Sequence, residues 1–243
     1  VMESNDGLNW NARVNFTKSN SIVTEQDDDQ IIFGGRQEAF LGGNAAIQGE
    51  ELGVLVGSRI ERNENGDMVV NASGNYVIEE SMSIDANGNQ VAAGTEGSRS
   101  ITPIIGNPTP DYVMNVINTI SYKNFNLGFQ VSHTSGGDIA TSTVATLLGR
   151  GGIVEDRKNT FILPGVGVDG SPNLLQINNS SYYFNNVLFG PKELSVYDGS
   201  VLRLQEISLG YSFPQEMLDK TPFGALSITA TGFNLWYDAY NVP

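Results

Sequence analysis

Polar and apolar residues alternate strictly over the first patterned stretch of the chain, Leu8 to Lys18. The even-numbered positions from Leu8 to Phe16 are all apolar, and the odd-numbered positions from Asn9 to Thr17 are all polar. A period of two predicts a β-strand with one apolar and one polar face. Soluble antiparallel sheets show the same pattern, so this stretch predicts a strand without deciding what its apolar face contacts.

Two further patterned stretches, Tyr112 to Tyr122 and Phe125 to His133, flank the dipeptide Lys123-Asn124. If this dipeptide is a two-residue turn, one register separates apolar from polar residues in both strands, and a slip by one residue would mix them. The apolar pairs are then Tyr122–Phe125, Ile120–Leu127, Val116–Val131 and Met114–His133, and the polar pairs are Ser121–Asn126, Thr119–Gly128 and Asn115–Ser132. Asn118 on the apolar side and Ile117 on the polar side are exceptions. We therefore predict an antiparallel hairpin.

Each strand of this hairpin has about ten residues, which is the length that crosses a bilayer when the strand is tilted. Aromatic residues stand near both ends, with Tyr112 at one and Tyr122 and Phe125 at the other. Such girdles are typical of transmembrane β-barrels. The alternation also predicts that Leu127 faces lipid and Gly128 faces the lumen, so arginine should be tolerated better at Gly128.

The end of the chain carries the same pattern twice, from Val201 to Phe213 and from Ala225 to Trp236. Pro214 ends the first of these strands. The sequence thus predicts five main strands, which cannot close a transmembrane barrel, and an open edge would leave backbone groups unsatisfied in lipid. The predicted fold class is therefore all-β, a fragment of a large antiparallel transmembrane β-barrel. That barrel would have about 22 strands if it follows the plugged outer-membrane transporters.

Two long excursions lie between the strands, at residues 20–109 and 135–200. The first contains short β-prone pieces separated by Asn-Gly and Ser-Gly turn signals and is too polar to cross a membrane. The second contains a Gly-Gly-Asp loop and a short helix within Ala140–Leu148, in which we expect Leu147 and Leu148 to be buried. Because outer-membrane barrels keep long loops outside the cell and tight turns in the periplasm, both excursions are predicted to be extracellular.

Composition removes several function classes. The 13 basic and 27 acidic residues give a formal charge of −14, which argues against nucleic acid and anionic phospholipid as partners. Cysteine is absent, which excludes disulfides and thiol nucleophiles, and the single histidine, His133, argues against most histidine-based catalysis. No run of about 20 apolar residues occurs, which excludes a spanning helix but not a membrane barrel, in which only alternate residues meet lipid.

One weak metal motif lies in the first excursion. Asp85, Asn87, Asn89 and Glu96 occupy positions 1, 3, 5 and 12 of an EF-hand-like calcium loop. Position 6 is Gln90 rather than the glycine that the sharp turn requires, so the sequence favours a hairpin turn with solvated carboxylates, with structural calcium as the alternative. We expect no other metal or cofactor.

An acid/base glycosidase is a rival interpretation, because a catalytic pair of carboxylates could be picked out by chance among 27 acidic residues. No carboxylate pair stands out near the strand ends, and no other convergent chemistry is visible. The sequence therefore predicts a protein that is not an enzyme and has no catalytic residues.

Several stretches resemble one family. They read VLRLQEISLGYSFP at 201–214 and ITATGFNLWYDAYNVP at 228–243, with further dense matches over Ile105–Lys123 and Gly136–Pro164. Together they resemble the C-terminal barrel of the SusC/RagA family, the TonB-dependent outer-membrane transporters of Bacteroidetes. Residues 22–99 share only the general character of the family's sequences, without its specific motifs. The chain begins at Val1 without an initiator Met and stops inside the last motif, so we expect residues 1–243 to be a cut piece that lacks the plug domain and final strand.

The resemblance implies an outer-membrane importer that moves oligosaccharide or peptide fragments into the periplasm. It implies a SusD-like surface lipoprotein as partner and a TonB complex that acts through the missing N-terminal part. By connectivity, the second excursion is the expected partner loop, with Asp138, Leu147, Leu148 and Arg150 as its candidate residues. The alternative is a secreted or surface β-sandwich adhesin or binding module, which would use the same alternation.

The residues predicted to face lipid share the apolar side of their strands. They are Leu8, Trp10, Val14, Phe16, Met114, Val116, Ile120, Leu127, Phe129, Val131, Ile207, Leu209, Tyr211 and Phe213.

Overall fold

The structure, a computed structural model, describes residues 2–3, 7–35, 43–79, 82–85, 87, 90–91, 95–153 and 156–240. The chain forms two compact units, each described here by itself. We call residues 1–19, 110–137 and 199–242 the sheet unit and residues 20–109 and 138–198 the excursion unit. The bounds of the excursion unit lie close to those of the two predicted excursions.

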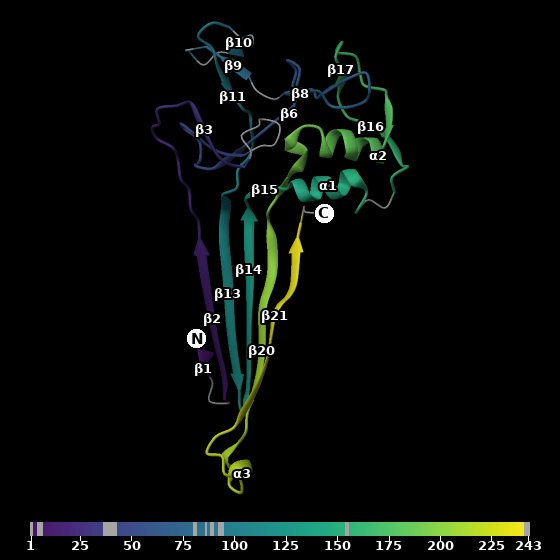
Figure 1. The fold of residues 1–243 in the computed structure, drawn as a ribbon. Coiled ribbons are helices and arrows are strands. Elements are labelled where there is room, and N and C mark those ends of the chain that lie inside the picture. The colour runs from purple at the N-terminus through teal and green to yellow at the C-terminus, as the bar shows by residue number, and fades with distance from the viewer. Residues whose placement is uncertain are drawn as a thin grey trace. The chain divides into compact units, whose positions relative to one another are not determined.

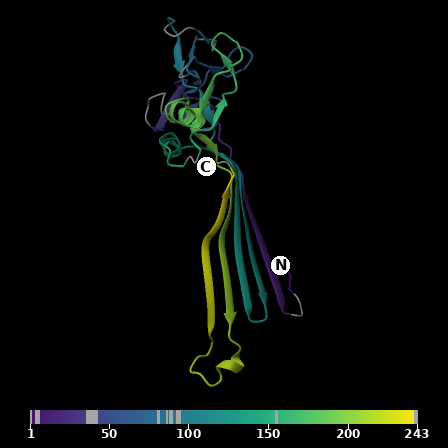
Figure 2. The same cartoon turned by 90° about the vertical axis from the view of Figure 1, so that its right-hand side faces the viewer.

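The sheet unit is a six-stranded antiparallel sheet with the order β1-β2-β13-β14-β20-β21 (Figures 1 and 2). Its strands are β1 (Met2–Glu3), β2 (Leu8–Thr17), β13 (Pro110–Tyr122), β14 (Phe125–Gly136), β20 (Val201–Ser212) and β21 (Ser227–Ala239). The five long strands and the antiparallel class confirm the prediction, whereas the two-residue β1 was not expected. The sheet does not close on itself, as expected for a barrel fragment.

The predicted hairpin register is confirmed. β13 pairs with β14 from Tyr122↔Phe125 through Met114↔His133, with Lys123 and Asn124 as the connecting turn. Lys123 has φ of 51°, the left-handed conformation that two-residue hairpin turns use because it matches the right-handed twist of the strands. The same register continues onto β2, where Tyr122 pairs with Leu8.

The connection between β20 and β21 is longer than the Lys123-Asn124 turn between β13 and β14. It contains the one-turn helix α3 (Gln215–Leu218), which begins directly after Pro214. β21 then begins at Ser227 and ends at Ala239, whereas the alternation predicted Ala225 to Trp236. The three extra residues at its end pair with the start of β20, from Arg203↔Tyr237 to Val201↔Ala239, so strand pairing rather than local pattern sets this boundary.

The excursion unit consists of small sheets and short helices. A four-stranded sheet has the order β12 (Ile104–Gly106), β5 (Val54–Val56), β4 (Gly43–Ile47) and β3 (Gln30–Gly35), and a three-stranded sheet has the order β10 (Gln90–Val91), β9 (Met82–Ile84) and β11 (Arg99–Ile101). Four strand pairs are β6 (Arg59–Ile60) with β8 (Ile78–Glu79), β7 (Val69–Val70) with β17 (Val166–Gly167), β15 (Asp138–Ala140) with β19 (Val196–Asp198), and β16 (Thr160–Ile162) with β18 (Gln176–Asn178). The helices are α1 (Ser142–Arg150), α2 (Asn179–Tyr182), the π-helix η1 (Tyr183–Leu188) and the 3-10 helix η2 (Lys192–Ser195).

Among the described residues, every buried apolar side chain except Leu218 belongs to the excursion unit. One cluster centres on Ile60 and Val70, a second on Val56, and a third joins α1 to η1 through Leu148 and Val187. The excursions therefore carry their own cores, as long ordered loops must. In the sheet unit, by contrast, all ten residues of β2 are exposed.

A buried amide connects distant parts of the excursion unit. Asn186 is 0% exposed, its Oδ1 accepts a hydrogen bond from the backbone N–H of Tyr76 at 2.8 Å, and its Nδ2 donates to Asn75 Oδ1 at 3.3 Å. Burying an amide is favourable only when its groups are paired, and these bonds satisfy both ends. Tyr182 packs nearby, and burial raises the pKa of its phenol to about 12.

The predicted short helix is present as α1, but one of its two predicted buried residues is not buried. Thr141 caps its N-terminus by accepting a hydrogen bond from the N–H of Val144, and Gly151 ends it in the left-handed conformation with φ of 81°. Leu148 is 8% exposed and packs in the core, whereas Leu147 is 42% exposed. Adjacent helical residues point about 100° apart, so η1 covers only one of them.

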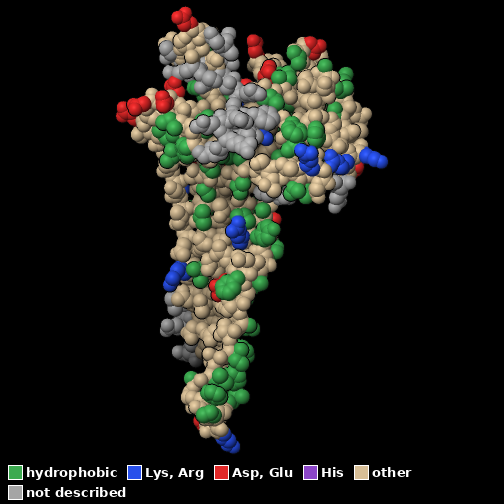
Figure 3. Space-filling view, in the orientation of Figure 1, with side chains coloured by type: hydrophobic (Ala, Val, Ile, Leu, Met, Phe, Trp, Pro, Cys, Tyr) green, Lys and Arg blue, Asp and Glu red, His purple; other side chains and the backbone are tan. Residues whose placement is uncertain are grey.

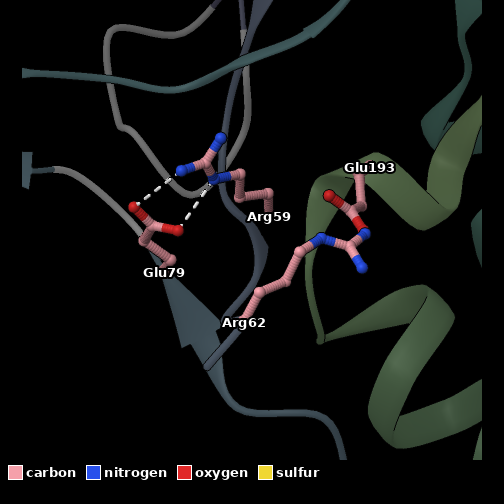
Figure 4. Close-up of polar contacts among 4 residues, drawn as sticks. All are labelled: Arg59, Arg62, Glu79 and Glu193. Atoms are coloured by element: carbon pink, nitrogen blue, oxygen red, sulfur yellow. Dashed lines mark hydrogen bonds and ion pairs between the residues drawn. The ribbon is translucent and has the colours of Figure 1, made fainter. Parts of the chain in front are cut away.

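Two ion pairs fix the β6–β8 region of the excursion unit (Figure 4). The guanidinium of Arg59 donates to both carboxylate oxygens of Glu79, at 2.7 and 3.1 Å. Arg62 Nη2 lies 3.3 Å from Glu193 Oε1 on η2. Burial raises the pKa of the Glu193 carboxyl, and the charge of Arg62 opposes that shift.

Charged side chains are distributed unevenly. On the face drawn in Figure 3, acidic side chains gather on the excursion unit, while the strands of the sheet unit carry few charges. In the described part of the chain, no helix is long and apolar enough to span a membrane.

Candidate functional site

The register places the predicted lipid-facing residues of β2, β13, β14 and β20 on one face of the sheet, which we call the apolar face. Its rows across these strands are Leu8–Tyr122–Phe125–Tyr211, Trp10–Ile120–Leu127–Leu209, Ala12–Asn118–Phe129–Ile207, Val14–Val116–Val131–Leu204 and Phe16–Met114–His133–Leu202. Large side chains on this face are solvent-exposed, including Val14 and Phe16 at 60% and Leu209 at 53%. Phe213 follows the end of β20. Exposed apolar patches of this extent mark a surface that another apolar phase covers; that this phase is lipid stays a prediction.

A β-bulge at Gln205 keeps the apolar face continuous. On either side of it, β14 pairs Gln130↔Glu206 and Val131↔Leu204, so Gln205 is the extra residue. The opposite strand β21 is also irregular there, with Asn234 at φ of 52°. A β-bulge inserts one residue into the strand, so the odd-numbered positions face one side of the sheet before the bulge and the other side after it. The sequence carries the signal, since leucines occupy even positions before Gln205 and apolar residues occupy odd positions after it.

Asn118, the polar exception on the apolar face, has a partner there. It is 7% exposed, and its Oδ1 accepts a hydrogen bond from Trp10 Nε1 at 3.0 Å. An unpaired amide in an apolar environment costs several kcal/mol, and the indole N–H removes part of that cost. The alternation could flag Asn118 as anomalous, but Trp10 lies 108 positions away and only the strand pairing brings the two together.

Aromatic side chains mark both ends of the apolar face. At one end Phe16 stacks on Tyr112 with ring centroids 5.4 Å apart, and Tyr112 Oη lies 3.2 Å from His133 Nδ1. At the other end Phe125 and Tyr211 lie 4.8 Å apart. The ten residue steps from Tyr112 to Tyr122 span about 33 Å, or about 25 Å at a tilt of about 40°, which equals the height of the apolar band of outer-membrane barrels.

The opposite face of the sheet, which we call the polar face, is lined mainly by amides and hydroxyls. Representative rows are Asn11–Thr119–Gly128–Ser208–Thr231 and Asn15–Asn115–Ser132–Arg203–Tyr237. A hollow of about 250 Å³ lies where Gly128 and Gly210 carry no side chain. A Cβ at Gly128 would lie 2.5 Å from Ser208 Oγ, so the strands approach closely there. Such a surface can line an aqueous passage and form hydrogen bonds to a polar solute.

The predicted partner-loop residues do not form one surface. Asp138 Oδ2 accepts a hydrogen bond from the backbone N–H of Asn107 at 2.7 Å, and Leu148 lies in the core. Leu147 and Arg150 are exposed on α1.

An aromatic pair is also exposed in the segment that packs against α1. Phe184 on η1 and Phe189 directly after it are 41% and 45% exposed, with ring centroids 5.0 Å apart. Leu147 on α1 is the third exposed apolar side chain of this helical pair. We call Leu147, Phe184 and Phe189 the exposed helical apolar residues.

The weak calcium motif is only partly described. Asp85 Oδ1 accepts a hydrogen bond from the N–H of Asn87 at 2.8 Å, which is an Asx turn, and Glu96 is exposed in a separate turn. Asn89 lies outside the described residues. Within the described ranges no group of three or more His, Cys, Asp or Glu residues is placed to hold a metal. Calcium binding stays a prediction.

The open antiparallel sheet, with one apolar and one polar face, has the architecture of a segment of a transmembrane β-barrel. No protein-family model matches the chain. Two curated relatives from Formosa agariphila are similar over 96% of it, TonB-dependent receptor P3 at 26% identity over 242 residues and TonB-dependent receptor P26 at 25% over 252 residues. This similarity confirms the resemblance of the chain to TonB-dependent receptors.

Solved structures agree on the fold. The RagAB peptide transporter matches 98% of the chain with a TM-score of 0.54 at 13% identity, and its closed-closed state matches with a TM-score of 0.55 at 14% identity. The chain spans less than a quarter of the length of each of these relatives and structures. The relatives are named as receptors and transporters, not as enzymes.

Proposed function

We propose that this chain is part of the barrel wall of an importer that moves glycan or peptide fragments across the outer membrane, of the SusC type found in Bacteroidetes. The main support is the common register of β2, β13, β14 and β20, which separates an apolar face from a polar face. The similarity of the chain to TonB-dependent receptors supports the same function. Because the fold of the chain is similar to that of a peptide transporter, peptides are one candidate cargo.

The two faces support separate roles. The apolar face meets lipid, because its exposed side chains between two aromatic ends match the height of a bilayer core. The polar face lines the lumen, where Asn and hydroxyl side chains exchange hydrogen bonds with a hydrated cargo. Walls lined mainly by amides and hydroxyls permit passage because each contact is weak.

Connectivity supports a direction. The tight turn at Lys123-Asn124 lies at one end of the strands, and the chain leaves and re-enters the sheet for both excursions at the other end. Since long loops of outer-membrane barrels face outward, the excursion unit is extracellular and the tight turn is periplasmic.

A SusD-like surface lipoprotein is the proposed partner of the excursion unit, and the exposed helical apolar residues are its proposed contacts. Leu147, Phe184 and Phe189 support this assignment, because large apolar and aromatic side chains at interface centres supply most of the binding energy. TonB would supply the energy through parts of the longer protein, as the names of the relatives indicate for those proteins.

The test is an uptake assay in the source bacterium with the gene for the full-length protein deleted. Labelled peptides and labelled oligosaccharides are offered separately, with and without a proton uncoupler. We expect the deletion to abolish uptake of one cargo class, and the uncoupler to have the same effect on the wild type. Unchanged uptake of both classes in the deletion strain would contradict the proposal, and uncoupler-resistant uptake would contradict TonB dependence.

A further inference from the structure

Two opposite charges lie close together on the polar face of the sheet. Arg203 and Glu206 belong to β20, and they pair with Ser132 and Gln130 of β14, which are two residues apart in sequence. At about 3.4 Å per residue, the two charged positions are about 7 Å apart along the sheet. The polar face around them is lined mainly by amides and hydroxyls, so this part of it differs in chemistry from the rest.

An aromatic side chain of β21 lies beside each charge. Glu206 pairs with Phe233, and Arg203 pairs with Tyr237. Phe233 is 66% exposed and Tyr237 is 70% exposed. Directly opposed residues of antiparallel strands have Cβ atoms about 5 Å apart, so each charge and its aromatic neighbour can contact the same ligand. We call Arg203, Glu206, Phe233 and Tyr237 the charged-aromatic cluster.

The cluster lies where the pairing of β20 with β21 is irregular. Between the pairs on either side, the register skips Gln205 in β20 and two residues in β21, Asn234 and Leu235. β-Bulges re-aim side chains and are frequent next to active sites. The irregular pairing therefore supports a functional use of the side chains beside it.

The cluster also lies near half the height of the sheet. Glu206 is in the row of Gln130 and Ile117, and Ile117 is the midpoint between Tyr112 and Tyr122. Ionisable side chains at membrane depth are costly and mark ligand pathways where they face a water-filled cavity. Charges at this height on the polar face are therefore expected to contact what passes through the barrel.

We propose that the charged-aromatic cluster binds short peptides with free termini. The guanidinium of Arg203 donates hydrogen bonds to the terminal carboxylate, and the carboxylate of Glu206 accepts them from the terminal ammonium. Two extended residues span about 7 Å, which matches the separation of the two charges along the sheet. Phe233 and Tyr237 contact the apolar side chains of the peptide.

This inference rests on the transport proposal and selects peptides over neutral glycans as cargo. A neutral glycan has no charged group for Arg203 or Glu206 to bind, and it would leave both charges without a ligand partner. A peptide with free termini supplies one group of each sign.

Isothermal titration of the purified full-length protein in nanodiscs tests the inference, with leucyl-leucine, its N-acetyl derivative and its C-terminal amide as probes. We expect leucyl-leucine to bind at least about tenfold more tightly than either blocked form, because a hydrogen bond to a charged group contributes more than a neutral one. The neutral trisaccharide maltotriose should also bind at least about tenfold more weakly than leucyl-leucine.

Two variants connect each charge to one end of the peptide. Arg203→Gln should weaken binding of leucyl-leucine about tenfold and leave binding of the C-terminal amide unchanged, because the amide lacks the group that Arg203 binds. Glu206→Gln should weaken binding of leucyl-leucine to the same extent and leave binding of the N-acetyl derivative unchanged. Arg13→Gln is the matched control and should bind like the wild type, since Arg13 is on the polar face in the row of Glu206 but three strands away.

Four results would overturn the inference: no binding of leucyl-leucine by the wild type, equal binding of leucyl-leucine and its blocked forms, tighter binding of maltotriose, or an equal loss for all probes in Arg203→Gln and Glu206→Gln. The last result would mean that the two side chains stabilise the sheet and do not bind peptide termini. The comparison of probes on the wild type holds even if a variant does not fold. An importer of neutral glycans would fail this titration and pass the uptake test, whereas failure of the transport proposal would appear as unchanged uptake in the deletion strain.

Discussion

Arginine at Val14 is the sharpest test of which face of the sheet meets lipid. Val14 is 60% exposed on the apolar face and pairs with Val116, while the next residue, Asn15, lies on the polar face and pairs with Asn115. Val14→Arg and Asn15→Arg therefore place the same charge on the same strand at nearly the same depth. We expect Val14→Arg to impair insertion and Asn15→Arg to be tolerated.

The free-energy cost of each arginine depends on its depth in the bilayer. Val116 lies one residue step from the midpoint between Tyr112 and Tyr122, or about 2.5 Å from the bilayer midplane along the membrane normal. Arginine near the midplane of a barrel's lipid face costs about 2–4 kcal/mol, which lowers an insertion equilibrium about 30- to 800-fold. Leu127 lies three steps from the midpoint, about 7.5 Å, so Leu127→Arg should cost about 1–2 kcal/mol.

The assay compares outer-membrane yields of full-length variants, with folding scored by heat-modifiable migration on gels. Gly128 looks like the natural lumen-side control from alternation alone, but its Cβ would meet Ser208 Oγ at 2.5 Å, so steric strain would confound the result. Asn15 avoids that contact. Equal yields for Val14→Arg and Asn15→Arg would refute the orientation, and a Leu127→Arg defect larger than that of Val14→Arg would refute the assigned depth.

Three other predictions follow from single contacts. Leu147→Gln should weaken co-purification of a SusD-like lipoprotein about tenfold without lowering barrel yield, because Leu147 is exposed. Thr146→Gln is the control, since Thr146 is also exposed on α1. Full recovery of the lipoprotein with Leu147→Gln would show that Leu147 is not part of the interface. Trp10→Phe should destabilise the sheet by about 1–3 kcal/mol, because it leaves the buried amide of Asn118 unpaired. Most of that loss should vanish when Asn118 is replaced by Leu. If chemical unfolding shows that the losses of stability from the two substitutions add in the double variant, the pairing is contradicted. Glu193 has a raised pKa in the folded state, so the folded protein binds more protons than the unfolded one between the two pKa values, and stability falls as pH rises through that window. Glu193→Gln should flatten this dependence in thermal melts from pH 4 to 8, and an unchanged slope would assign it to another group.

Local pattern determined most of the sheet unit. The five long strands were predictable because each carries its own period-two alternation, which sorts side chains without reference to any partner. The β13–β14 register was predictable because a two-residue turn at Lys123-Asn124 leaves one arrangement that separates polar from apolar residues. The excursions were predictable as interruptions of that pattern, but their small sheets and cores were not, because short strands of two or three residues have too little periodicity to identify.

Only the tertiary structure decided the contacts between residues distant in sequence. The change of parity at Gln205 is visible in the sequence, but the pairing of β20 with β14 and β21 was needed to show that Gln205 is the inserted residue. The partner of Asn118 depended on β2 lying beside β13. The choice of Leu148 over Leu147 as the buried residue of α1 depended on where η1 lies. One pocket of the excursion unit is lined by five segments that are separate in sequence, from Gly43 to Ser195. Alternation fixes which residues share a face, because it is a property of the local backbone; which faces and segments meet depends on chain topology, and no local pattern records it.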